Sequence, residues 1–249
     1  MQQNGNNMKA KSIENLNVKI FADGADLNNI LELNKNPIIK GFTTNPTLMR
    51  AAGIDDYESF AKDVLDKIKD KSISFEVFAD DKENIIKQAE KIASWQENVS
   101  VKIPIMNTDG IFSGDIIEFL SKKNIPLNIT AIMTSGQVNE LKDHLNPDCA
   151  SIISVFAGRI ADTGINPEET MNRCKELLVN HKKSQLLWAS PRELYNIYQA
   201  ELCGCDIITV PHNLLNKLNL INKDLINYSK ETVKMFFDDA LKSGFQINT

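Results

Sequence analysis

Short runs of apolar and β-branched residues alternate along the chain with longer stretches in which apolar residues recur at helical spacing. The runs that predict strands are 18–22, 38–43, 73–78, 99–105, 127–132, 151–156, 185–189 and 206–210. The stretches that predict helices are 26–35, 56–70, 81–96, 110–123, 135–145, 167–182, 191–203, 212–218 and 223–243. Strands that are each followed by a helix are typical of a closed parallel barrel, because right-handed crossovers place every helix outside. The pattern therefore predicts an α/β fold, a single (β/α)8 TIM barrel with an additional C-terminal helix.

An open doubly wound sheet would show the same order of elements. A dinucleotide-binding sheet of that kind needs Gly-x-Gly-x-x-Gly after its first strand, and this chain has none there. The length of 249 residues is the usual size of one barrel, and no linker or low-complexity segment divides the chain. We expect a catalytic barrel domain over residues 16–249 and a flexible N-terminal tail over residues 1–15.

Several predicted strands carry polar residues at alternate positions. In the fourth run, Val101 and Ile103 share one face, whereas Lys102 lies on the other, because successive strand residues point to opposite faces. Polar side chains of this parity are Ser74, Glu76, Ser100, Lys102, Asn128, Thr130 and Ser154. The outer face of a barrel strand lies under helices, so these residues must point into the lumen. Polar groups are costly there unless they meet water or a ligand, which indicates an active site.

Composition and charge exclude several classes of function. The chain has 28 basic and 33 acidic residues, a net charge of −5, so we expect neither nucleic acid nor an anionic membrane surface as a partner. No run of about 18 apolar residues exists that could span a membrane. The four cysteines lack the spacing of a zinc site, so we expect reduced thiols, no metal and a cytoplasmic location.

Three motifs occupy the ends or interiors of predicted strands. The first strand ends in Phe21-Ala-Asp-Gly24, the second in Gly41-Phe-Thr-Thr-Asn-Pro46, and the fourth contains Val101-Lys-Ile-Pro104. In this order, these segments resemble the transaldolase family, including its close relatives the fructose-6-phosphate aldolases. The resemblance extends over essentially the whole barrel, from about residue 18 to about residue 245.

The resemblance implies a mechanism without cofactor or metal. A lysine amine attacks a ketone when it is neutral, and burial disfavours the charged form, so Lys102 is expected to form a Schiff base with the substrate. The resemblance gives Asp23 the role of acid and base at the cleaved carbon–carbon bond. It gives Glu76 and Thr130 the role of holding a catalytic water.

The resemblance also implies a set of substrate-binding residues. Asn45 and Asn128 match residues that bind the hydroxyls of the three-carbon unit, and we place Thr43 and Phe156 with the binding residues. Arg159, Ser190 and Arg192 match a phosphate site, with Ser154 close by. Arginine suits this role because its planar fork matches phosphate oxygens, and only four arginines occur in the chain.

Two positions distinguish the branches of the family. The aldolase branch typically carries Gln and Tyr where this chain has Glu76 and Phe156. We therefore expect a transaldolase of the pentose phosphate pathway, which converts sedoheptulose 7-phosphate and glyceraldehyde 3-phosphate to erythrose 4-phosphate and fructose 6-phosphate. The alternatives are a fructose-6-phosphate aldolase that releases dihydroxyacetone and a non-catalytic barrel that binds sugar phosphates. The resemblance also implies a homo-oligomer, either a dimer or a larger ring. The last helix, which carries apolar residues such as Phe236 and Phe237, is expected to dock either on its own barrel or on that of a neighbour.

Overall fold

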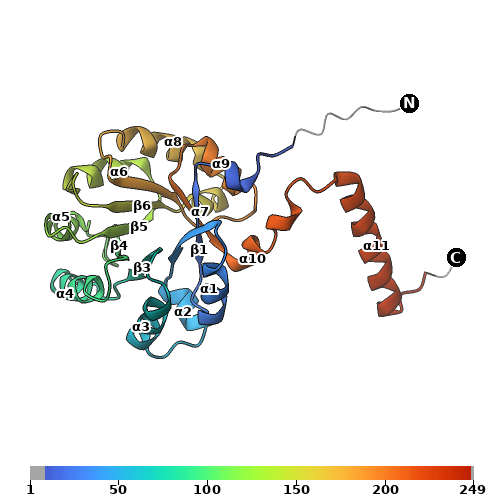
Figure 1. Ribbon diagram of the computed structural model, residues 1–249. Helices are drawn as coiled ribbons and strands as arrows, with labels where there is room; N and C mark the ends of the chain where they lie inside the picture. The colour runs from blue at the N-terminus through green and yellow to red at the C-terminus, as the bar shows by residue number, and fades with distance from the viewer. Residues whose placement is uncertain (1–8, 248–249) are drawn as a thin grey trace.

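The computed structural model describes residues 9–247 and contains a closed barrel of parallel strands whose order around the barrel follows the chain (Figure 1). The strands are β1 (Lys19–Asp23), β2 (Ile39–Thr43), β3 (Ser72–Glu76), β4 (Val99–Pro104), β5 (Leu127–Ile132), β6 (Ser151–Val155), β7 (Ser184–Trp188) and β8 (Ile207–Pro211). The barrel closes because β8 pairs with β1 along the whole length of both strands. The prediction of a TIM barrel is confirmed.

Helices follow the strands and form the outer layer (Figure 1). They are α1 (Leu27–Asn34), α2 (Pro46–Ala51), α3 (Tyr57–Lys67), α4 (Lys82–Ala93), α5 (Gly114–Lys122), α6 (Ser135–Leu141), α7 (Ala157–Asp162), α8 (Pro167–Leu177), α9 (Asn196–Leu202) and α10 (His212–Leu215). Single 3₁₀ turns lie at η1 (Ile13–Asn15), η2 (Lys142–His144) and η3 (Leu218–Leu220). Most helices begin at a side-chain cap, as α4 does where Asp81 accepts the N–H of Asn84.

Two short helices, α2 and α7, were not expected from the sequence. Each has six residues and lies in the loop that follows its strand, β2 or β6. α2 begins with Pro46 after the N-cap Asn45, a dipeptide that also fits an ordinary turn. α7 contains Gly158, which disfavours a helix by propensity alone. Both helices border the open end of the barrel.

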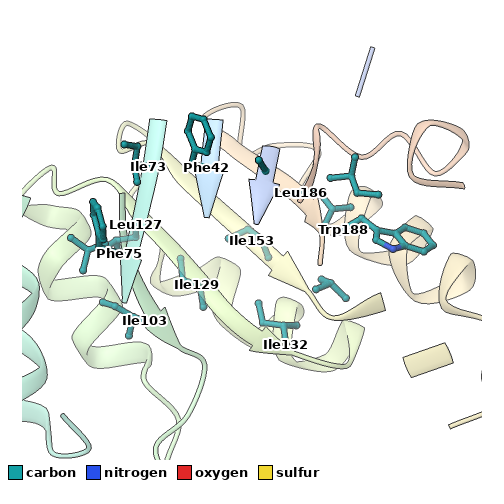
Figure 2. Close-up of a cluster of buried hydrophobic side chains, with 14 of the residues drawn as sticks. Phe42, Ile73, Phe75, Ile103, Leu127, Ile129, Ile132, Ile153, Leu186 and Trp188 are labelled. Carbon is teal, nitrogen blue, oxygen red and sulfur yellow. The ribbon is translucent and has the colours of Figure 1, made fainter. Parts of the chain in front are cut away.

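Apolar side chains on the strands build a core between sheet and helices (Figure 2). Fully buried examples from consecutive strands are Phe42, Phe75, Ile103, Ile129, Ile153 and Trp188. Helices contribute residues at helical spacing, such as Ile85, Ala89 and Ile92 of α4. Because the apolar residues of each strand face the helices, the polar residues at alternate positions of the same strands point into the lumen.

The additional C-terminal helix is also confirmed, as α11 (Leu225–Ser243), which begins at the N-cap Asp224 and ends at Gly244 in the left-handed conformation. It stands away from the barrel (Figure 1), and none of its residues is buried. Phe236 and Phe237 are 63% and 62% exposed. No helix within residues 9–247 has the length and apolar character needed to cross a membrane.

The predicted N-terminal tail, residues 1–15, falls partly outside the described residues. In the described part, Ala10 exchanges two hydrogen bonds with the side chain of Asn222, and Lys11 pairs with Glu201 at 3.1 Å. The division of the chain into tail and barrel stays a prediction.

Candidate active site

A cavity of about 610 Å³ lies at the carboxyl ends of the barrel strands. It is lined by all the residues to which the sequence analysis assigned a catalytic or substrate-binding role, and these come from seven of the strands or the loops after them. These are Asp23, Thr43, Asn45, Glu76, Lys102, Asn128, Thr130, Ser154, Phe156, Arg159, Ser190 and Arg192. The carboxyl ends of the strands are where barrel enzymes hold their catalytic groups. The roles of the individual residues stay predictions.

Lys102 lies in the middle of β4 and is only 7% exposed. Its Nζ donates a hydrogen bond to the main-chain oxygen of Thr44 at 3.1 Å and lies 3.1 Å from Glu76 Oε2. Glu76 ends β3 and is the direct register partner of Lys102, so the two side chains leave neighbouring strands side by side. The strand register therefore fixes an amine and a carboxylate next to each other inside the barrel.

Asp23 ends β1 and faces the same cavity. Thr43 Oγ1 donates to Asp23 Oδ1 at 2.8 Å and also shares a hydrogen bond with the hydroxyl of Thr209. Burial raises the pKa of the Asp23 carboxyl, and the nearby charge of Glu76 acts in the same direction. The positive charge of Lys102 and the Thr43 hydroxyl oppose this shift but do not cancel it. A carboxyl with a raised pKa can both accept and return a proton nearer to neutral pH.

A buried polar network crosses the lumen below these groups. Asn128 on β5 donates through Nδ2 to Ser74 Oγ at 2.9 Å, and Ser154 on β6 donates to Asn128 Oδ1 at 2.6 Å. The three side chains come from β3, β5 and β6, and each is at most 2% exposed. Since both ends of the amide are engaged, its orientation is fixed. This arrangement confirms that the polar parity of the strands points inward.

Two buried oxygen atoms in the cavity lack a hydrogen-bonding partner within the described part of the chain. They are Thr130 Oγ1 and Glu76 Oε2, the second of which lies close to Lys102 but outside hydrogen-bonding alignment. Buried polar atoms are seldom left unsatisfied, because an unmade hydrogen bond costs free energy. Both atoms can therefore accept a hydrogen bond from a molecule that enters the cavity.

Asn45 lines the cavity but also caps α2. Its Oδ1 accepts the main-chain N–H of Leu48 at 3.0 Å. This bond occupies the acceptor end of the amide, so Asn45 can offer a ligand its Nδ2 group, which is a donor.

The mouth of the cavity carries the two arginines that follow β6 and β7. The guanidinium of Arg159 lies over the ring of Phe156, 5.2 Å from its centre. Arg192 pairs through two nitrogens with the carboxylate of Asp162, one at 2.9 Å. Both arginines are exposed. Phe156 lies one residue beyond the end of β6, so its ring reaches the cavity from the strand–helix junction and not from the strand itself.

The loops after β6 and β7 touch through Gly158 and Ser190. The N–H of Gly158 donates to Ala189 O at 3.3 Å, and a Cβ added at Gly158 would lie 1.6 Å from Ser190 O. Ser190 has a φ of +62°, a left-handed conformation that costs free energy for a residue with a side chain. This close approach places the Ser190 loop directly beside Arg159.

Thr209, which lines the cavity from β8 and hydrogen-bonds Thr43, was not predicted as a site residue. Threonine is common in strands, so the residue type carries no signal of its own. Its position two residues after Ile207 in an otherwise apolar run was the one available clue.

Residues 20–249 match the family model described as Transaldolase/Fructose-6-phosphate aldolase. A protein of Sulfurihydrogenibium sp. named "Probable transaldolase" is 33% identical over 202 residues, which are 81% of this chain and 88% of that protein. A protein of the same name from Thermoanaerobacter sp. is 30% identical over 231 residues, or 92% of this chain and all of that protein.

Among solved structures, similarity is limited to the fold. A dihydrodipicolinate synthase from Rhodopseudomonas palustris superposes with a TM-score of 0.56 at 13% identity, covering 94% of this chain and 82% of that chain. The CdNal protein of Clostridium difficile, solved in complex with mannosamine, gives a TM-score of 0.54 at 12% identity, covering 90% of this chain and 82% of that chain.

Proposed function

The chain belongs to the transaldolase/fructose-6-phosphate aldolase family, and we propose that it is a transaldolase that works through a Schiff base on Lys102. Family membership and the names of its relatives support a transaldolase-type function. The observation that carries the proposal is the buried Lys102 amine, which lies 3.1 Å from Glu76 in a cavity shared with Asp23.

In the proposed reaction, the Lys102 amine adds to the ketone carbon of sedoheptulose 7-phosphate, and loss of water leaves an iminium. Asp23 removes the proton from the C4 hydroxyl, the C3–C4 bond breaks, and its electron pair moves into the iminium. Erythrose 4-phosphate leaves as the aldehyde. The three-carbon enamine then attacks the aldehyde carbon of glyceraldehyde 3-phosphate, and Asp23 returns the proton to the new hydroxyl. Hydrolysis releases fructose 6-phosphate and the free amine, without cofactor or metal.

The position and pKa of Asp23 support its part in this cycle. A base that must first take and later return one proton works best when its pKa is near the working pH. Burial raises the pKa of this carboxyl in that direction. Thr43 holds one carboxylate oxygen and leaves the other for the substrate hydroxyl.

Imine formation and hydrolysis each need a water molecule that can move protons. We propose that Glu76 and Thr130 hold it, as the family resemblance implies. The two oxygens without a partner, Glu76 Oε2 and Thr130 Oγ1, support this assignment, because a water between them would satisfy both. The water would also lie beside the Lys102 amine, where the carbinolamine loses its hydroxyl.

The proposed phosphate site consists of Arg159, Ser190 and Arg192 at the mouth. Exposed guanidinium groups are accessible to a charged group that arrives from solvent, and their fork geometry suits phosphate oxygens. Asn45 and Asn128 are proposed to bind the hydroxyls of the three-carbon unit deeper in the cavity. Ser154 fixes the Asn128 amide for this purpose.

We also propose that the enzyme acts in the pentose phosphate pathway in the cytoplasm, where its four free, buried cysteines would stay reduced. A homo-oligomer is supported by α11, whose large apolar side chains are exposed along its length. Light scattering of the full chain and of a variant with Phe236→Ser and Phe237→Ser tests this assembly. A monomer in both samples would contradict it.

Trapping with borohydride tests the central proposal. Fructose 6-phosphate and borohydride should fix a three-carbon or six-carbon adduct on the peptide that contains Lys102, as detected by mass spectrometry. Assays with and without glyceraldehyde 3-phosphate then separate transfer from release of free dihydroxyacetone. A chain that forms no adduct would favour a barrel that binds sugar phosphates without catalysis, and release without transfer would identify an aldolase.

A further inference from the structure

Tyr57, the first residue of α3, makes an unusual contact with the main chain of β3. Its hydroxyl accepts a hydrogen bond from the N–H of Glu76 at 2.8 Å and donates one to the carbonyl of Glu76 at 3.0 Å. Tyr57 does not line the active-site cavity. One hydroxyl therefore holds both polar main-chain groups of the residue that faces Lys102.

The reason lies in where the β2–β3 ladder stops. Thr43 pairs with Ser74, and the N–H of Thr44 donates to Ser74 O at 3.2 Å. In a regular parallel ladder, the next rung would join the N–H of Glu76 to Thr44 O, and the N–H of residue 46 to Glu76 O. Residue 46 is proline and has no N–H to donate.

The other half of that missing rung is occupied by the catalytic amine. Thr44 O accepts its hydrogen bond from Lys102 Nζ at 3.1 Å. On the opposite side of β3 the ladder continues, since the N–H of Val77 donates to Lys102 O at 3.1 Å. At Glu76, the Tyr57 hydroxyl thus makes the hydrogen bonds that β2 would make in a regular ladder. The carbonyl of Thr44 accepts a hydrogen bond from Lys102 instead.

The ring of Tyr57 is fixed by an aromatic cluster. It meets Phe78 edge-on at 4.4 Å between ring centres and also contacts Phe75 and Trp95 at 6.1 Å and 5.9 Å. Burial raises the pKa of the Tyr57 hydroxyl, so it stays protonated and can donate and accept at once. The sequence around Tyr57 reads as a plain amphipathic helix, so nothing in its pattern indicates this contact.

We propose that Tyr57 is a positioning residue for the reaction. It holds the end of β3 in place of β2, and by doing so it reserves the Thr44 carbonyl for the Lys102 amine, which keeps Lys102 and Glu76 at their working distance. This inference rests on the proposed Schiff-base function. Without the hydroxyl, the N–H of Glu76 would compete with Lys102 for Thr44 O, because a buried donor is costly to leave unpaired.

Tyr57→Phe tests the proposal, because it removes one oxygen atom and leaves the aromatic cluster in place. We expect the rate of borohydride trapping and kcat to fall about 10-fold, the equivalent of one lost hydrogen bond. KM for sugar phosphates should stay within about twofold, since both arginines are untouched. The pH profile of trapping should shift as well. Trapping depends on the Lys102 amine, which is close to the carboxyls of Glu76 and Asp23, so a change in the position of Glu76 changes the charges around the amine.

The matched control is Tyr198→Phe, which also removes a hydroxyl that donates to a main-chain carbonyl, that of Lys11 at 2.9 Å, outside the cavity. It should leave trapping, kcat and the pH profile unchanged. Equal losses in both variants, or a folded Tyr57→Phe protein with wild-type kcat and pH profile, would overturn the inference. Wild-type protein that cannot be trapped at all would instead overturn the proposed function, and this inference with it.

Hydrogen exchange tests the contact first in the wild-type protein and then in the two variants. The amide proton of Glu76 should exchange slowly in the wild-type protein, although it lies at a strand end, because the Tyr57 hydroxyl accepts it. Tyr57→Phe should accelerate its exchange, whereas Tyr198→Phe should not. Fast exchange in the folded wild-type protein would overturn the inference.

Discussion

The inner part of the cavity and its mouth hold their charges in different ways. Inside, the Lys102 amine is buried and has partners from the chain itself, a main-chain carbonyl and a carboxylate. At the mouth, Arg159 and Arg192 are exposed, and their partners are an aromatic ring and an exposed carboxylate. Interactions among buried charges are strong, whereas those among exposed charges are weakened by water and salt.

This difference suits the buried groups to catalysis and the exposed groups to substrate binding. Buried groups that are held by the strand register are suited to change reactivity, because burial can shift a pKa, as it does for Asp23. Exposed guanidinium groups are suited to bind a charged substrate group that arrives from solvent. We therefore expect substitutions inside to lower kcat and substitutions at the mouth to raise KM.

The largest effect is expected for Lys102→Met. The variant keeps an unbranched side chain but has no amine, so no iminium can form, and turnover should fall by a factor on the order of 10⁴ or more. Borohydride should trap no adduct, while circular dichroism stays that of the wild type. The control is Lys71→Met, another lysine that donates to a main-chain carbonyl, that of Asn34 at 2.6 Å, outside the cavity. Substantial turnover in folded Lys102→Met would mean that the amine that forms the Schiff base is not that of Lys102.

Substitutions of the arginines at the mouth should weaken substrate binding. Arg159→Ala and Arg192→Ala should each raise KM for phosphorylated substrates by about 10- to 150-fold, the equivalent of one charged hydrogen bond, with little change in kcat. Steady-state kinetics with fructose 6-phosphate and with unphosphorylated fructose would measure this. Arg173→Ala, which removes a surface arginine paired with Glu176 on α8, is the matched control. Equal losses with both sugars would remove the arginines from the phosphate site.

A smaller effect is expected at the boundary between the two regions. Phe156 carries no hydroxyl that could protonate the three-carbon adduct, so the adduct should persist until an aldehyde arrives. Phe156→Tyr adds a phenolic O–H and should raise the ratio of free dihydroxyacetone to transferred product several-fold, and Glu76→Gln should act in the same direction. Phe119→Tyr, an exposed position on α5, is the control. If the ratio stays the same in folded Phe156→Tyr, the ring does not decide between transfer and release.

The smallest effect concerns stability. The pKa of Asp23 is raised above its ordinary value of 3.8, so this carboxyl favours the folded state below that pH, where it is neutral in both states. As pH rises past 3.8, the unfolded chain ionises first, and stability is lost until pH passes the folded-state pKa. Asp23→Asn should therefore have nearly the wild-type Tm at low pH and a modestly higher Tm near pH 8. A gain that shrinks as pH rises would mean that burial does not dominate at Asp23.

The sequence predicted the barrel well because both of its determinants are local. Alternation along a strand sets which residues face the lumen, and turn and capping signals set where helices begin. The parity of Glu76, Lys102 and Asn128 was enough to bring them together.

Contacts that depend on the meeting of distant loops were not predictable in this way. The two short helices α2 and α7 have six residues each, which is too short for a helical repeat of apolar residues to be recognised in the sequence. Their residues fit turns equally well. The contact of Tyr57 with Glu76 depends on a β2–β3 ladder that stops at Thr44, two residues before Pro46, and on the packing of Tyr57 against the end of β3. Side-chain to main-chain bonds of this kind leave no repeating pattern in a sequence.

Gly158 has a consequence for how the mouth can change under selection. Any side chain at this position would collide with the carbonyl of Ser190, so the loops that carry Arg159 and Arg192 would have to part. Every other amino acid is therefore strongly disfavoured at this position, although glycine contributes no side chain to the site. In a library randomised over the whole mouth and selected for turnover, Gly158 should return unchanged in nearly every active clone. New substrate preferences would then arise by substitution of the arginines themselves, because a substitution at Gly158 cannot change the spacing between their loops in small steps.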